Sequence, residues 1–248
     1  MVSVAITTIC DLVEHCRRRL DDVSPLDDLP ETNLQLIQQA AEEADESDLL
    51  WTTAELRHYA NEAIREVAIR TRCIRDNARN VAGFTSFELA PGENEVSIDH
   101  RILVVRKVFW NGIVLWPDSE QFLDEASSTW REDTTDCPRR FVLNRSARQL
   151  MLVGLPTTAG TVSFDVIRMP MKAIEQGIPE IPPKYLPHCL HWMCHLAYLK
   201  NDADTADANQ AANYETLFTA AVGPSRTDHE VELAYHQQGR RRARLYYF

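Results

Sequence analysis

Apolar residues recur every three or four positions near both ends of the chain, which is the spacing of one helix face. This pattern predicts helices over 5–20 and 53–79 toward the start, and over 185–200 and 207–222 toward the end. A shorter helix is expected over 32–44, where one face is apolar and the other is acidic. Because the longer segments have matching apolar stripes, we expect them to pack in one antiparallel bundle.

Two of these helices have clear ends in the sequence. Thr52 and Glu55 have the spacing of a capping box at the start of the helix over 53–79. Gly223 and Pro224 stop the last helix, because glycine accepts the backbone conformation that ends a helix and proline cannot continue one. The boundaries near these residues are therefore set by local chemistry.

Strand signals fill the middle of the chain, from about 84 to 169. Asn111 and Gly112 separate two apolar runs, and this pair is a strong hairpin signal because both residues tolerate positive φ. Pro91 and Gly92 mark another turn. A short helix near 119–126 and a polar loop interrupt the strands. The expected strands are 84–89, 95–98, 102–110, 113–116, 141–144, 150–153 and 161–169.

The order of helices, strands and helices predicts an α+β fold. The expected architecture is an antiparallel helical bundle with an inserted, mostly antiparallel β-sandwich or barrel-like module and an extended C-terminal arm. A proline-rich stiff linker follows the strands. The expected domains are a helical domain in two parts, 1–80 (with an acidic insert over 23–49) and 178–224, a β module over 81–177, and an arm over 225–248.

Composition is that of an ordinary folded protein, with 248 residues, 44% of them hydrophobic and 25% charged. The six cysteines have no CxxC spacing, so reduced thiols in a cytosolic compartment are expected. The start of the chain lacks the basic segment of a signal peptide, and its apolar stretch is broken by Asp11. No apolar run approaches the length of a membrane span, so no membrane partner is expected.

The candidate chemistry is sparse. His188, His191 and His195 share one face of the predicted helix over 185–200, which is acceptable geometry for a zinc enzyme, but no carboxylate partner is present. Trp192 lies on the same face, which is usual where a helix packs in an interior or an interface, and these four residues are the candidates for a subunit interface. No nucleophile elbow or phosphate-binding loop occurs among the eight glycines. We therefore expect no catalytic residue, no metal, no cofactor and no enzyme activity.

The end of the chain combines cations with aromatic residues. A DNA-binding module and a solvated tail are alternatives, but the net charge of −11 favours a docking arm for a protein surface. The residues of this predicted arm are Arg240, Arg241, Arg242, Arg244, Tyr246, Tyr247 and Phe248.

With these elements placed, the chain resembles the head-to-tail adaptor (neck, or connector) proteins of tailed bacteriophages. Three stretches carry the resemblance, and the β region fits in order and length more than in motif. They are residues 12–22, residues 50–68, and residues 181–223 from the Ile181-Pro182-Pro183 segment through the Phe218–Gly223 segment. One departure is the insert over 23–49, where such adaptors tend to have a short loop.

The resemblance implies a structural virion protein of the neck, assembled in the host cytoplasm. It implies a homo-oligomeric ring, commonly of twelve copies, that binds the portal and receives a tail protein such as a nozzle, tail-tube or fibre protein. Double-stranded DNA would pass through the ring channel without specific binding. Acids facing that channel would repel phosphates and keep the DNA mobile. The residues predicted for this role are Glu42, Glu43, Asp45, Glu46 and Asp48.

Overall fold

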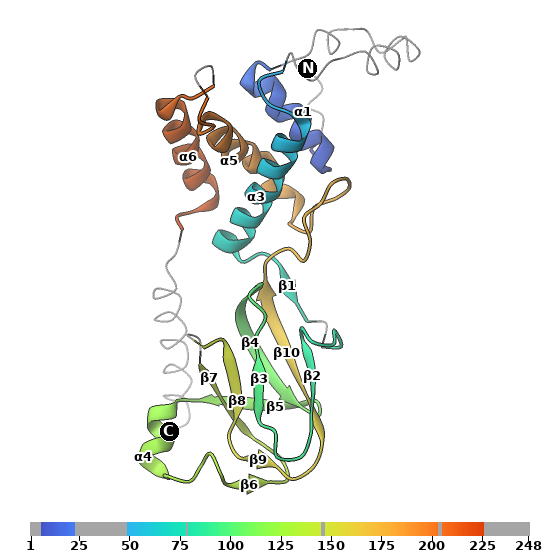
Figure 1. The fold of residues 1–248 in the computed structure, drawn as a ribbon, viewed down its shortest axis with the longest axis vertical. Helices are drawn as coiled ribbons and strands as arrows, with labels where there is room; N and C mark the ends of the chain where they lie inside the picture. Colours follow the sequence, from blue (N-terminus) through green and yellow to red (C-terminus); the bar gives the residue numbers. More distant parts are fainter. Residues whose placement is uncertain (1–5, 23–48, 78, 145–146, 203–204, 226–248) are drawn as a thin grey trace, which may run out of the picture. The chain divides into compact units, whose positions relative to one another are not determined.

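The computed structural model of the protein describes residues 6–22, 49–77, 79–144, 147–202 and 205–225. It confirms the α+β fold, with helices in one compact unit and a mostly antiparallel sheet in another (Figure 1). The helical unit contains the described residues up to Thr71 and from Lys172 onward, and the β unit is Arg72–Met171. The domain boundaries expected at 80/81 and 177/178 stay a prediction. The helix expected over 32–44 lies outside the described residues.

Helix α1 (Ile9–Leu20) begins four residues later than expected, because a capping box defines its start. The Thr8 hydroxyl accepts a hydrogen bond from the Asp11 backbone amide at 3.2 Å, and the Asp11 carboxylate accepts one from the Thr8 amide at 2.8 Å. Asp21 ends the helix in the left-handed conformation. The predicted apolar stripe is buried.

Helix α3 (Thr53–Thr71) confirms the predicted capping box, since Thr52 and Glu55 exchange hydrogen bonds at 2.8 and 3.2 Å. The predicted extension of this helix to residue 79 is wrong. Arg72 has a φ of 52°, which breaks the helix, and the chain then forms strand β1 (Arg75–Asp76). That segment pairs with a distant strand, which a continued helix would not allow, and Ile74 is buried.

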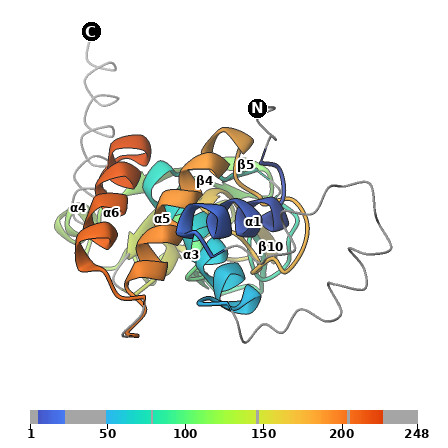
Figure 2. The same ribbon diagram turned by 90° about the horizontal axis from the view of Figure 1, so that it is seen from above.

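Helix α5 (Leu186–Tyr198) follows a short 3-10 turn, η2 (Pro183–Tyr185), and precedes helix α6 (Ala208–Val222). Seen from above, α5 lies between α6 on one side and α1 with α3 on the other, and it contacts all three (Figure 2). This central position explains why the sequence of α5 is apolar on more than one face. The side chain of Asp207 caps α6 by accepting hydrogen bonds from the Asn209 and Gln210 amides.

The β unit contains one eight-stranded sheet, whose order is β1-β10-β4-β5-β7-β8-β3 with β2 also paired to β10 (Figure 1). Its strands are antiparallel except for the parallel pair of β5 and β7. The strands are β2 (Ser86–Leu89), β3 (Glu95–Ser97), β4 (Ile102–Trp110), β5 (Ile113–Asp118), β7 (Arg140–Asn144), β8 (Gln149–Leu152) and β10 (Gly160–Arg168). Strands β6 (Thr134–Thr135) and β9 (Leu155–Pro156) form a separate pair.

The predicted hairpin at Asn111 and Gly112 is confirmed, and both residues have positive φ, 46° and 81°. The turn at Gly92 also forms, but β2 and β3 on either side of it pair with β10 and β8 rather than with each other. Packing inside the sheet requires a glycine at position 160, because a Cβ there would lie 2.3 Å from the Trp110 ring.

Helix α4 (Glu120–Ala126) covers part of the face of the sheet that points away from the main core. It begins at Ser119, whose hydroxyl accepts a hydrogen bond from the Phe122 amide. Leu123 of α4 packs with Trp130 and Val142 in a second, smaller hydrophobic cluster. This helix therefore divides the outer face of the sheet into a covered part and an uncovered part.

Candidate assembly surfaces

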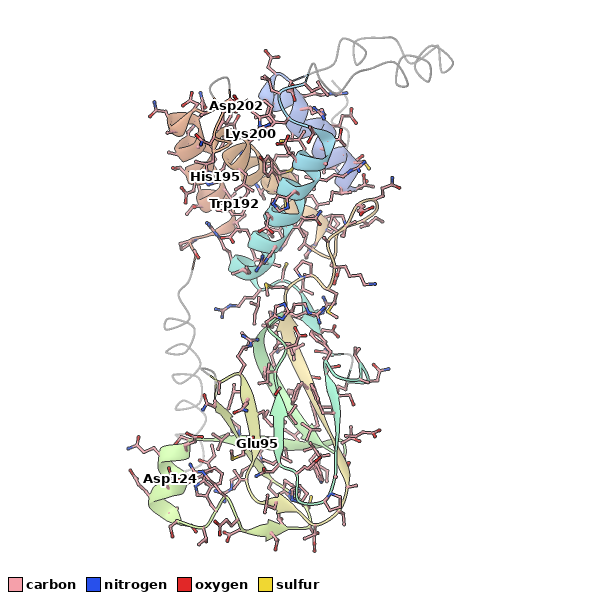
Figure 3. All side chains as sticks on the ribbon, viewed as in Figure 1. Glu95, Asp124, Trp192, His195, Lys200 and Asp202 are labelled. Carbon is pink, nitrogen blue, oxygen red and sulfur yellow. The ribbon has the colours of Figure 1, made fainter. Side chains whose placement is uncertain are left out.

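The histidine face of α5 packs partly against α6 of the same chain. His195 is buried, with Nδ1 2.9 Å from the carbonyl oxygen of Ala211, and the Trp192 ring centroid lies 4.9 Å from that of Phe218 (Figure 3). His188 and His191 are half-buried, and their ring centroids are 6.3 Å apart. Of the four residues predicted for a subunit interface, His188, His191 and Trp192 thus keep accessible surface, whereas His195 is enclosed.

The surroundings of His191 favour its neutral imidazole. Burial lowers the pKa of His191, and the charge of Arg19, whose guanidinium nitrogen lies 3.3 Å from the ring, adds to that shift. Within the described residues, no three His, Cys, Asp or Glu side chains form a group that could hold a metal ion. None of the helices described combines the length and the apolar character needed to cross a membrane.

Arg70 joins α3 to the end of α6, where the C-terminal arm begins. Its guanidinium donates to the Thr219 hydroxyl at 3.0 Å and to the Gly223 carbonyl at 3.2 Å, and it pairs with Glu66 at 2.6 Å. The same group lies over the rings of Trp192 and Phe218, 5.0 and 4.9 Å from their centroids. The last described residues of the chain are thus held at the end of α6. The C-terminal arm stays a prediction, because its docking residues, Arg240 to Phe248, lie outside the described residues.

The two ends of the acidic insert are held together at one place. The buried carboxylate of Asp22 accepts hydrogen bonds from the amides of Leu50 at 3.0 Å and Trp51 at 3.3 Å. Arg17 pairs with Asp22 at 3.0 Å and donates to the Trp51 carbonyl at 2.9 Å and the Thr53 hydroxyl at 3.0 Å. We call these contacts the insert base.

The acids expected in a DNA channel belong to the segment that the insert base closes. All five, Glu42, Glu43, Asp45, Glu46 and Asp48, lie outside the described residues, so their channel position stays a prediction. The structure does show where the two ends of this segment are attached to the helical unit, at the insert base. Because residues 22 and 50 are in contact, the chain between them leaves and returns at the same point of the helical unit.

The β unit has an exposed apolar surface that was not predicted from the sequence. Trp116 is 59% exposed and Val114 is 44% exposed, although both belong to a central strand, β5. The signal was the unbroken apolar run 113–116, because neighbouring residues of a strand point to opposite faces and one face here is not core. We call this surface the β5 face, defined by Val114, Trp116 and the neighbouring cations Arg106, Lys107 and Arg140.

Comparison with known proteins identifies a family whose model covers most of the chain. The model of a protein family described as SU10 adaptor protein matches residues 8–244, which is most of the chain and includes the segments of both units. Curated proteins yield no match.

Proposed function

Because the chain belongs to the SU10 adaptor protein family, a family of phage head-to-tail adaptors, we propose that it is a subunit of a ring between portal and tail. The family match over 8–244 is the observation that carries this proposal, and it confirms the resemblance found in the sequence. It identifies a bacteriophage adaptor with a structural role.

The finer parts of the proposal concern partners and place. The ring joins the portal to a tail protein in the neck of the virion, after assembly in the host cytoplasm, and its channel carries double-stranded DNA. A head-to-tail contact between identical subunits closes such a ring only if two different surfaces of one chain are complementary. The twelve copies implied by the family resemblance are the expected number.

We assign portal docking to the C-terminal arm. The contacts of Arg70 with Thr219 and Gly223 support this, because they give the arm a rigid starting point on the helical unit. In this proposal the four arginines of the arm provide forked donors for portal carboxylates, and its three aromatic residues provide large rigid surfaces for a pocket. An acidic, apolar-lined groove on the portal is the matching surface.

Deleting residues 240–248 tests the arm. Binding to portal rings should weaken by about 2–4 kcal/mol if one or two aromatic residues act as anchors. Co-sedimentation of the truncated chain with purified portal rings measures the loss, and circular dichroism checks that the helical unit stays folded.

A matched variant separates recognition from charge alone. Replacing Arg240, Arg241, Arg242 and Arg244 with lysine keeps the charge but removes the forked donors, so it should weaken binding less than the deletion does. Full binding by the truncated chain would show that the arm does not dock on the portal. If the complete chain binds duplex DNA in a salt-dependent way and the truncated chain does not, the arm instead contacts DNA.

A further inference from the structure

The β5 face is an uncovered part of the outer side of the sheet. Leu115 points into the main core, so Val114 and Trp116 on either side of it point outward. Val114 lies opposite Phe109 of β4, which is covered by the guanidinium of Arg79 at 3.8 Å from its ring centroid. Beyond β7, the outer side is covered by the cluster around Leu123. The exposed apolar residues thus lie between two covered parts of one sheet.

Cations lie on both sides of these apolar residues. The register between β10 and β4 shifts from Asp165 opposite Lys107 to Val166 opposite Val105, so Arg106 is the extra residue of a β-bulge. Arg106 and Lys107 are both exposed, and neither has an ion pair within the described part of the chain. On the other side, Arg140 lies opposite Trp116 in the β7 pairing and is 48% exposed.

The chemistry of the β5 face fits a segment with acids and aliphatic residues. The carboxylate of Asp118 already pairs with Arg140 at 2.9 Å, so Arg106 and Lys107 are the cations that remain for a partner's acids. Duplex DNA offers phosphates with only sugar carbons beside them, and stacking on Trp116 would require an unpaired base. The exposed Val114 therefore favours a protein segment over DNA.

The chain itself carries a segment of this kind. Residues 23–49 contain eight acids and no Lys or Arg, and they include six leucine or isoleucine residues. These residues are Leu26, Leu29, Leu34, Leu36, Ile37 and Leu49. The insert base holds both ends of this 27-residue segment together. Its middle can therefore lie at most about 45 Å from the insert base.

We propose that the β5 face binds the acidic insert 23–49 of a second copy of this chain. The proposal rests on the ring proposed above, because a closed ring needs two different complementary surfaces on each subunit. The acidic insert supplies one surface and the β5 face supplies the other. This assignment places the acids of the insert between subunits, in contrast to the channel position expected from the sequence.

A charge exchange in the full chain tests the contact during assembly on portal rings. Arg106→Glu with Lys107→Glu should lower the number of bound adaptor subunits at least tenfold at low ionic strength, as measured by the mass of the complex. Adding Glu42→Lys and Glu43→Lys to the same chain should restore assembly, because attraction returns with reversed signs. Arg75→Glu, an exposed cation on β1, is the control and should assemble normally.

Cross-linking identifies the occupant directly. A photoreactive phenylalanine analogue at position 116, in a mixture of isotopically heavy and light chains, should give heavy-to-light cross-links to residues 23–49. Cross-links only within single copies, or normal assembly of the charge-reversed chain, would overturn the proposal. Loss of DNA retention with an unchanged subunit number would identify a DNA surface instead. If the wild-type chain fails to assemble on portal rings, it is the proposed function that fails, whereas the cross-link pattern of the free chain still tests the contact.

Discussion

At the scale of single residues, Arg70 connects α3 with α5 and α6 in the helical unit. Its side chain is 5% exposed and reaches one acid, one hydroxyl, one carbonyl and two aromatic rings. Arginine suits this position because a planar guanidinium donates at its edge while it stacks on rings with its face. A buried cation of this kind is stabilising only while its partners remain in place.

Replacing Arg70 with alanine should destabilise the helical unit by about 2–4 kcal/mol, because Glu66 and the carbonyl of Gly223 lose their donor and the ring contacts disappear. Urea unfolding followed by tryptophan fluorescence measures the change. Arg65→Ala is the matched control on the same helix, since its pair with Glu62 is exposed and contributes less than about 1 kcal/mol. Equal effects of the two variants would contradict this role.

At the scale of elements, α1 and α3 each begin at a capping box that contains a carboxylate. Protonation of that carboxylate makes the helix start sensitive to acid. Hydrogen bonds from the backbone amides of Thr7 and Thr8 lower the pKa of Asp11 from 3.8 to about 2. An acid whose pKa is lowered by folding stabilises the folded state above its unfolded pKa and loses that contribution as the pH falls to its folded pKa. For α1 this window lies between about pH 4 and pH 2.

The thermal stability of the protein should therefore fall between about pH 4 and pH 2, and Asp11→Asn should remove part of that dependence. Part should remain, because the hydrogen bond from the Arg101 side chain also lowers the pKa of Asp99 to about 2. Unfolding temperatures of the two proteins across this range provide the measurement. Parallel curves for wild type and variant would show that the cap of α1 does not contribute.

At the scale of the whole molecule, we expect the insert base to make the acidic insert separable from the fold. The hydrogen bonds from the amides of Leu50 and Trp51 to Asp22 join the two residues that flank the insert, and they use none of its inner residues. Closing a shorter loop costs less chain entropy, and the cost changes only slowly with length. The helical unit should therefore not depend on residues inside the insert.

Replacing residues 24–48 with a short Gly-Ser linker should leave the unfolding temperature within a few degrees of the wild-type value. Circular dichroism on heating measures it. Asp22→Ala in the complete chain is the contrasting variant and should destabilise the protein by about 1–3 kcal/mol, because it leaves two amides without their acceptor and removes the carboxylate partner of Arg17. An excised chain that fails to fold would contradict the independence of the insert.

Sequence alone determined the features that depend on neighbouring residues. The capping box at Thr52 and Glu55, the hairpin at Asn111 and Gly112 and the order of helices and strands follow from local hydrogen bonding, allowed φ and side-chain periodicity. The same local signals carried the resemblance to phage adaptors, because the family is recognised by an ordered set of such segments.

Tertiary structure decided where a helix ends within a helical sequence pattern, and which apolar or aromatic residues are buried or exposed. The end of α3 at Thr71, eight residues before the predicted end, depends on pairing with β10, nearly a hundred residues away. The enclosure of His195 depends on α6, and the exposure of Trp116 depends on which residues of a sheet remain uncovered. These outcomes arise from contacts between segments distant in sequence, whose free energies no local pattern contains.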